Sequence, residues 1–112
     1  MEVSMQNIVK DKIPEIEPQG LRVLKVSNLE DIAKISKVLK SPTRQKLLKI
    51  LKEEPMEVSK LARKLNQTEA NISAQIQNLQ KVGLIKSRYE PGGHGVRKVC
   101  EVVVDKIIIS LN

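Results

Sequence analysis

The spacing of the apolar residues in this 112-residue sequence changes at Gly83, and that change limits the folds that the chain can adopt. From Leu29 to Gly83, apolar residues recur every three or four positions, which is the period of an amphipathic helix. After Gly83 they alternate with polar residues, which is the period of a half-buried strand. The sequence therefore predicts helices at 29–40, 42–53, 58–65 and 69–82, followed by antiparallel strands at 84–89 and 96–104.

Residues with strong positional preferences mark the ends of these elements. Ser41 before Pro42 is typical of a helix start, because serine caps the first N–H groups and proline has no N–H that needs a partner. Thr68 is placed to cap the fourth helix, and Gly83 is placed to end it in the left-handed conformation. Residues 90–95 predict a glycine-rich loop between the two strands. The candidate caps of the first and third helices are Ser27 or Asn28, and Ser59.

The length of the chain suits one compact domain. Residues 1–20 contain prolines, a glycine and scattered charges, which predict an extended or partly disordered arm. The remainder, 21–112, is expected to form a single domain with further short strands at 21–26 and 107–111. Because Tyr89 is the only aromatic residue, Leu, Ile and Val must build the core.

Charge is distributed unevenly along the chain. The sequence has 20 Lys and Arg against 13 Asp and Glu, a formal net charge of +7. Residues 34–112 hold 16 of the basic and 7 of the acidic side chains, so the excess belongs to the predicted helices and strands. A basic domain favours a polyanionic partner such as nucleic acid or an acidic membrane surface, and charge alone does not choose between them.

No apolar run approaches the ~20 residues that cross a bilayer, and residues 1–20 lack the apolar core of a signal peptide. We therefore expect a cytoplasmic protein without a membrane partner. The single cysteine, Cys100, cannot form an internal disulfide and has no neighbours spaced for a zinc site. We interpret it as a small residue in a strand, with redox sensing as the alternative.

The outward face of the predicted helix 69–82 has an unusual composition. A solvated helix face normally carries Lys and Glu, whereas this one carries mostly Ala, Ser, Asn and Gln. Amides can donate to and accept from base edges, and Ala allows close approach to the floor of a groove. We interpret this face as a base-reading surface, with a solvated or protein-contacting face as the alternative. The residues predicted to contact bases are Asn71, Ala74, Gln75 and Asn78.

Basic side chains surround that helix. From residue 60 to residue 98 there are 8 basic and 2 acidic side chains, which favours collective backbone binding over scattered surface charge. Phosphate contacts of this kind set affinity and register, not sequence preference. Thr68, besides capping its helix, leaves N–H groups available to a phosphate. The residues predicted to contact the DNA backbone are Lys60, Arg63, Lys64, Thr68, Ser73, Lys81, Arg88, His94, Arg97 and Lys98.

The sequence contains no arrangement of residues that is typical of an active site or a metal site. It has no nucleophile with a positioned base, no paired carboxylates in an apolar setting and no cluster of metal ligands, so no enzyme activity, metal or cofactor is predicted. The glycine-rich stretch 92–95 lacks the flanking helix and the Lys-Ser/Thr of a nucleotide-binding loop. It predicts a flexible hairpin tip, where His94 is solvated or contacts a phosphate.

Four stretches of the sequence carry a resemblance to a known family. They are Ser41–Leu51, Val58–Ala62, Thr68–Ile76 and Leu79–Ile85. Over roughly residues 30–104 the chain resembles the ArsR-like winged helix-turn-helix transcription regulators, especially small archaeal ones. The resemblance implies a homodimeric DNA-binding repressor or activator with helix 69–82 as its recognition helix.

The sequence departs from that family in two respects. Metal sensors of the family place cysteine pairs in the short helix near residues 57–62, or His and acidic ligands on a C-terminal helix, and neither is present here. No metal sensing is therefore predicted. The chain also ends in an apolar strand instead of a long helix, so we expect helix 29–40 and strands 21–26 and 107–111 to supply the dimer interface.

Taken together, these patterns predict a winged helix-turn-helix protein of class α+β, mainly α, with four helices, a β-hairpin wing and short terminal strands. The predicted function is sequence-specific binding of double-stranded DNA as a homodimer, with helix 69–82 in the major groove and wing 86–98 on the backbone. The alternative is a winged-helix module for protein–protein contact in a larger complex. No small-molecule ligand is inferred.

Overall fold

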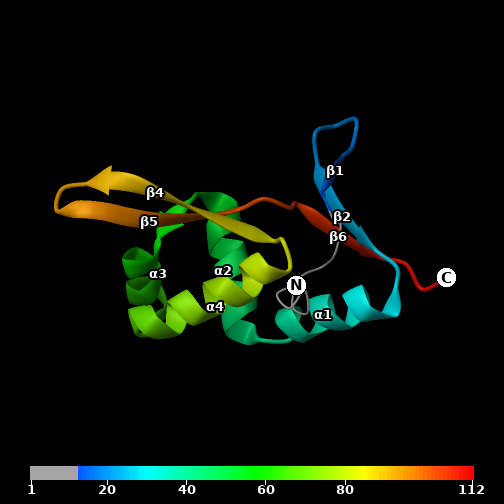
Figure 1. The fold of residues 1–112 in the computed structure, drawn as a ribbon, viewed down its shortest axis with the longest axis horizontal. Coiled ribbons are helices and arrows are strands. Elements are labelled where there is room, and N and C mark those ends of the chain that lie inside the picture. The colour runs from blue at the N-terminus through cyan, green and yellow to red at the C-terminus, as the bar shows by residue number, and fades with distance from the viewer. Residues whose placement is uncertain (1–12) are drawn as a thin grey trace, which may run out of the picture.

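A computed structural model describes residues 13–112, in which four helices and two small sheets surround one apolar core (Figure 1). The helices are α1 (Leu29–Leu39), α2 (Pro42–Glu53), α3 (Val58–Leu65) and α4 (Glu69–Lys81). Asn28, Ser41 and Thr68 cap α1, α2 and α4, each accepting a hydrogen bond from the backbone N–H three residues further on. The predicted class, α+β with four helices, a hairpin wing and short terminal strands, is confirmed.

The start of α3 differs from the prediction. Glu57, not Ser59, occupies the N-cap position, and its side chain makes no capping hydrogen bond. Ser59 lies inside the helix and donates to the Glu57 carboxylate at 3.0 Å. The reason is that strand β3 (Met56–Glu57) pairs with strand β5 (Gly95–Val102), so the chain enters the helix directly from a strand.

The wing consists of β5 and the antiparallel strand β4 (Ile85–Gly92), with β3 on the outer side of β5. It is longer than predicted, because the expected loop 90–95 is mostly paired. Pro91 lies opposite Val96, and only Gly93 and His94 remain at the tip. β4 is an edge strand, where a proline need not donate to a neighbour, and this explains why Pro91 does not end the strand.

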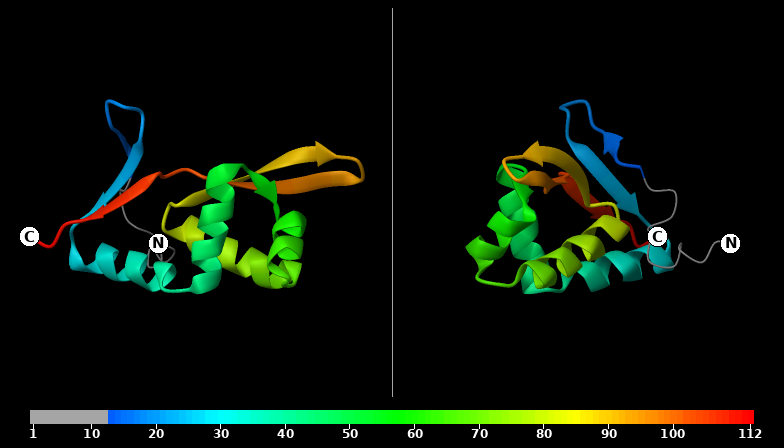
Figure 2. Two further views of the ribbon diagram at one scale, coloured as in Figure 1. Left: turned by 180° about the vertical axis from the view of Figure 1, so that it is seen from behind. Right: turned by 60° about the vertical axis from the view of Figure 1, so that its left-hand side comes forward.

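The second sheet joins the two ends of the described chain. It has the order β1 (Glu15–Ile16), β2 (Arg22–Val26) and β6 (Lys106–Ile109), with β2 parallel to β6. The predicted strands 21–26 and 107–111 are thus present, whereas β1 lies inside the predicted arm 1–20. Residues 1–12 of that arm lie outside the described residues. Figure 2 shows this terminal sheet and the wing at opposite ends of the molecule.

Leu, Ile and Val build the core, as expected from the scarcity of aromatic residues. Helices α1 to α4 each contribute fully buried side chains to the core cluster, and the terminal sheet adds two more to the same cluster. These residues are Ile35, Leu47, Leu61, Ile72, Ile76, Leu79, Leu24 and Val26. Gly83, with a φ of +83°, ends α4 in the left-handed region and turns the chain into β4, as predicted.

Asp105 anchors the terminal sheet to the helices. Arg22 donates to its carboxylate from both the backbone N–H (2.7 Å) and the guanidinium (2.9 and 3.0 Å). Lys52 of α2 forms a further ion pair with it at 2.9 Å, and the Asp105 side chain is only 9% exposed. The hydrogen bonds from Arg22, and then that from Lys52, hold the pKa of Asp105 well below its usual range.

We predict that Asp105→Asn changes how stability depends on pH. A carboxyl whose pKa is lowered by folding stabilises the protein above its unfolded pKa of ~3.9, and that contribution is lost as the pH falls below this value. In denaturant unfolding at pH 7, the variant should therefore have a lower free energy of unfolding than the wild type. The difference between the two free energies should become smaller below about pH 4. Two parallel stability curves down to pH 2.5 would contradict this assignment.

Candidate nucleic-acid interface

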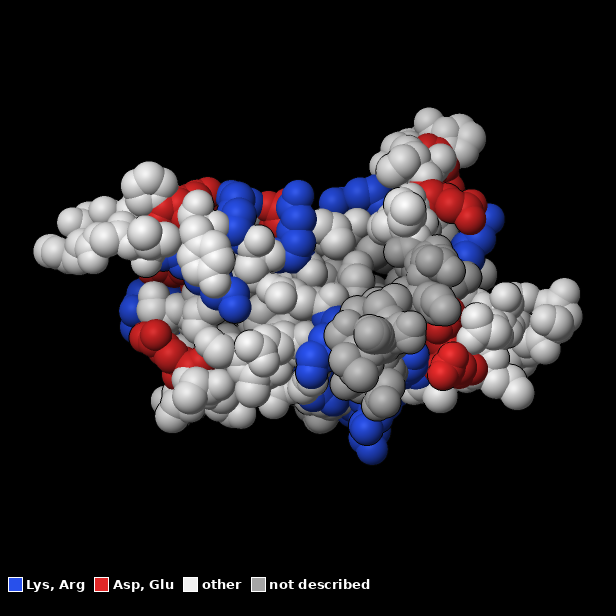
Figure 3. Space-filling model, viewed as in Figure 1, with Lys and Arg blue, Asp and Glu red and all other residues white. Residues whose placement is uncertain are grey.

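Helix α4 has one buried and one exposed face. Ile72, Ile76 and Leu79 are completely buried and attach the helix to the core. The opposite face is largely uncharged and forms the white surface left of centre in Figure 3. Of the four predicted base contacts, Asn71 and Ala74 are exposed, and Gln75 and Asn78 are half-buried. Gln77 is also exposed on this face, although it was not predicted to contact a base.

Two of these amides are held in one orientation by neighbours. The Asn71 amide nitrogen donates to Gln67, whose own amide nitrogen donates to the Thr43 hydroxyl at 3.4 Å. The Gln75 carbonyl oxygen accepts from Arg44 Nη1 at 2.7 Å. The carbonyl oxygen of Asn71 therefore remains available as an acceptor, together with the second N–H of its amide, and the amide nitrogen of Gln75 remains available as a donor.

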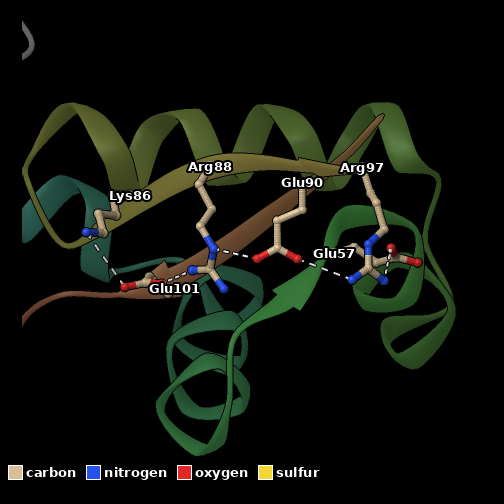
Figure 4. A network of polar contacts seen from close by, with 6 residues as sticks. All are labelled: Glu57, Lys86, Arg88, Glu90, Arg97 and Glu101. Carbon is tan, nitrogen blue, oxygen red and sulfur yellow. Dashed lines mark hydrogen bonds and ion pairs between the residues drawn. The ribbon is translucent and has the colours of Figure 1, made fainter. Parts of the chain in front are cut away.

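The arginines of the wing are paired with glutamates. Arg88 donates to Glu90 at 2.7 Å and also contacts Glu101, while Arg97 contacts Glu90 at 3.2 Å and Glu57 at 3.4 Å (Figure 4). The hydrogen bond from Arg88 lowers the pKa of Glu90, and the same bond raises the pKa of Arg88. With Lys86, which lies 3.9 Å from Glu101, three positive and three negative charges balance in this network.

The two faces of the wing differ in charge. Antiparallel partners share a face, so the paired positions 86 with 101 and 90 with 97 put the ion-pair network on one side. The opposite face carries Ser87, Tyr89 and Lys98, and Ser87 donates a hydrogen bond to Gln80 of α4. Lys98 therefore lies on the α4 side of the wing, whereas Arg88 and Arg97 lie on the other side.

A residue that sequence reasoning missed lies on this α4 side. Tyr89 is 69% exposed, and together with Gln80 and Lys98 it lines a shallow hollow of about 420 Å³ at the junction of wing and helix. A tyrosine exposed beside a basic side chain can pack on a sugar or donate its hydroxyl hydrogen to a phosphate. The available signal was that Tyr89 is the single aromatic residue and occupies an outward strand position.

The other predicted backbone contacts are distributed around α4. Lys60, Arg63 and Lys64 are exposed on α3, which packs against α4. Thr68 and Lys81 are exposed at the two ends of α4, Ser73 is half-buried along it, and His94 is exposed at the tip of the wing. The structure thus collects Thr68, Ser73, Lys81 and Lys98 around one helix and places His94 farther out.

Cys100 is completely buried in β5, in agreement with its interpretation as a small residue in a strand. Burial raises the pKa of its thiol, which disfavours the reactive thiolate. Among residues 13–112, no three His, Cys, Asp or Glu side chains are grouped so that they could hold a metal ion. No helix in this part of the chain is long and apolar enough to cross a membrane.

Known proteins share this arrangement. Residues 39–88 match a family of helix-turn-helix domains. The chain is similar to a homodimeric winged helix-turn-helix DNA-binding domain from Mycobacterium bovis, a possible ArsR-family transcriptional regulator, with 26% identity and a TM-score of 0.59. That match covers 66% of this chain and 65% of the other. No curated protein sequence matches the chain.

Two further solved structures have the same fold. One is an ArsR family transcriptional regulator, with 26% identity and a TM-score of 0.55, covering 65% of this chain and 76% of the other. The second is a transcriptional regulator homologue from Pyrococcus horikoshii, with 24% identity and a TM-score of 0.56, covering 67% and 77%.

The fold and the exposed face of α4 define a winged helix-turn-helix protein. The helix-turn-helix match and the structural neighbours confirm the resemblance to ArsR-like regulators that the sequence shows.

Proposed function

We propose that the protein is a cytoplasmic transcription regulator that binds double-stranded DNA sequence-specifically as a homodimer. The observation that carries this proposal is the largely uncharged, exposed face of α4 between basic residues of α3, the wing and its own C-terminal end. In the major groove that face meets base edges, while the surrounding cations meet phosphates.

The orientations of the Asn71 and Gln75 amides suggest which groups on the base edges each of them can contact. The carbonyl oxygen of Asn71 can accept from an adenine or cytosine amino group, and the amide nitrogen of Gln75 can donate to a guanine or thymine oxygen. Ala74 lies between them without polar atoms and suits a thymine methyl group. Each well-formed base contact contributes ~1–3 kcal/mol of discrimination, so a few such residues suffice for sequence preference.

The homodimer is supported by apolar residues at the terminal-sheet end of the molecule. These exposed side chains are Ile16, Leu29, Ile108, Ile109 and Leu111. Among the described residues β6 pairs only with β2, so its other edge can accept a strand. Residues 107–112 carry no charge, and antiparallel pairing with the same segment of a second copy therefore opposes no like charges. We propose that β6, β2 and α1 form the interface.

Selection of bound duplexes from a random pool tests the proposal. A symmetric dimer with two recognition helices should enrich an inverted repeat whose half-sites lie about one helical turn apart, or a multiple of it. Enrichment of a single half-site would contradict the dimer but not the reading of sequence. If nothing is enriched while the protein still binds a partner protein, the chain is an interaction module instead.

A further inference from the structure

The outer half of the wing carries an exposed apolar strip. Past the end of β3, the strands β4 and β5 of the described chain pair only with each other, over four residue pairs or about 13 Å (Figure 1). Tyr89, Pro91 and Val96 share the α4 side of this projection, because antiparallel partners and alternate residues lie on the same face. Tyr89 is 69% exposed and Val96 is 72% exposed, so the strip is open to a partner.

The charges of the wing lie mostly elsewhere. On the opposite face, three glutamates balance the three cations of the ion-pair network. Residues 91–96 contain no Lys, Arg, Asp or Glu, and the outer end of the wing is white in Figure 3. Lys98, opposite Tyr89 in the register, adds a cation to the strip. The strip therefore suits a partner that combines apolar groups with a negative charge.

The strip continues the exposed face of α4. Ala74, Gln77 and Gln80 recur every third residue, so they follow one side of that helix toward the wing. Gln80 and Tyr89 then line the same shallow hollow at the junction of helix and wing. A duplex that lies on α4 therefore meets the strip next.

The position of the wing indicates which part of the duplex it meets. The terminal sheet, proposed as the dimer interface, and the wing lie at opposite ends of the molecule (Figure 2). The two wings of such a dimer lie at its outer ends, beside the DNA that flanks the inverted repeat. The backbone of that DNA presents the C–H groups of deoxyribose rings between phosphates, which is the combination of chemistry that the strip suits.

From these observations we propose that Tyr89 and Val96 bind the DNA that flanks each half-site, by packing on deoxyribose rings beside a phosphate held by Lys98. This inference rests on the proposed function, since it requires α4 to lie on DNA and the terminal sheet to form the dimer. Burying apolar surface releases no counterions. The wing thus contributes affinity that does not depend on salt, through side chains other than Arg88 and Arg97.

The test compares two substitutions of Tyr89 on two lengths of DNA. Tyr89→Thr removes the ring but keeps a residue that favours strands, and the matched control Tyr89→Phe removes only the hydroxyl group. The projection spans ~4 base pairs at ~3.4 Å each, so the long duplex extends about eight base pairs beyond each half-site of the selected sequence. The short duplex ends at the half-sites. Circular dichroism and urea unfolding check that each variant folds as the wild type does.

Fluorescence anisotropy between about 50 and 200 mM salt gives the affinity and its salt dependence. On the long duplex, Tyr89→Thr should bind roughly 10-fold more weakly, with the wild-type slope of log K against log salt. Tyr89→Phe should bind as the wild type does. On the short duplex, Tyr89→Thr and the wild type should have equal affinity. Lys98→Gln should make the slope on the long duplex shallower by about 1.

Four results would overturn the inference and leave the proposed function intact. They are wild-type affinity of Tyr89→Thr on the long duplex, an equal loss for Tyr89→Phe, a loss for Tyr89→Thr that persists on the short duplex, and an unchanged slope for Lys98→Gln. An equal loss for Tyr89→Phe would assign the contact to the hydroxyl group instead of the ring. A wild-type protein that binds no duplex overturns both the inference and the proposed function.

Discussion

Replacing Ala74 with glutamate should abolish DNA binding without unfolding the protein. Ala74 is exposed near the middle of α4, between Asn71 and Asn78, where a carboxylate would approach the phosphates and displace a close base contact. Losing one base contact costs ~1–3 kcal/mol, and the unfavourable charge adds to this, so we expect affinity for the selected duplex to fall about 100-fold or more. Fluorescence anisotropy with a labelled duplex measures the loss.

Gln19→Glu is the matched control for this substitution. Gln19 is exposed in the turn between β1 and β2, in the terminal sheet at the opposite end of the molecule from the wing, so the change adds the same charge away from α4. It should retain most of the binding, and both variants should unfold within about 0.5 kcal/mol of the wild type, since neither removes a buried contact. If both variants lose binding equally, net charge rather than the face of α4 decides affinity.

Among the substitutions predicted in this section, Ile76→Ala should lower the free energy of unfolding most. Its side chain is completely buried on the inner face of α4, within the core cluster. Truncating a buried isoleucine to alanine costs ~2–5 kcal/mol, a large share of the ~5–15 kcal/mol that holds such a domain together. Urea unfolding followed by circular dichroism should show a lower midpoint, and DNA binding should weaken only where the folded fraction falls.

Ile76→Val provides a graded comparison at the same site. It removes one methylene group and should cost ~0.5–1.5 kcal/mol, with DNA affinity of the folded protein unchanged. A cost for Ile76→Ala below that of Ile76→Val would show that α4 is not held by this stripe. The pairing of Ala74→Glu with Ile76→Ala thus separates the two faces of α4, one for binding and one for folding.

The elements that sequence reasoning located correctly depend on neighbours within four residues. Ser41 and Thr68 cap their helices through bonds to the third residue onward, and Gly83 ends α4 through its own backbone conformation. The predictions that were wrong depend on contacts between residues that are far apart in the sequence. Ser59 does not cap α3, because β3 pairs with β5, some forty residues later in the chain, and Glu57 then occupies the N-cap position. Pro91 lies within β4, because β4 is an edge strand in which a proline need not donate a hydrogen bond.

In the candidate site, too, the features that follow from local sequence patterns were predicted, and those that depend on distant residues were not. The exposed amide face of α4 follows from helical periodicity, whereas the pairing of wing arginines does not: Glu57 lies 40 residues before Arg97 in the chain. A count of basic residues between 60 and 98 therefore overstated the positive charge of the wing.

By itself, the sequence determined the helices, the hairpin, the apolar core and the uncharged face of the recognition helix, since repeating patterns and caps act locally along the chain. Only the tertiary structure decided which charges remain available to a phosphate. Electrostatic attraction depends on distance through space, and the contacts of Arg44 with Gln75 and of Arg97 with Glu57 join residues that are remote in the sequence.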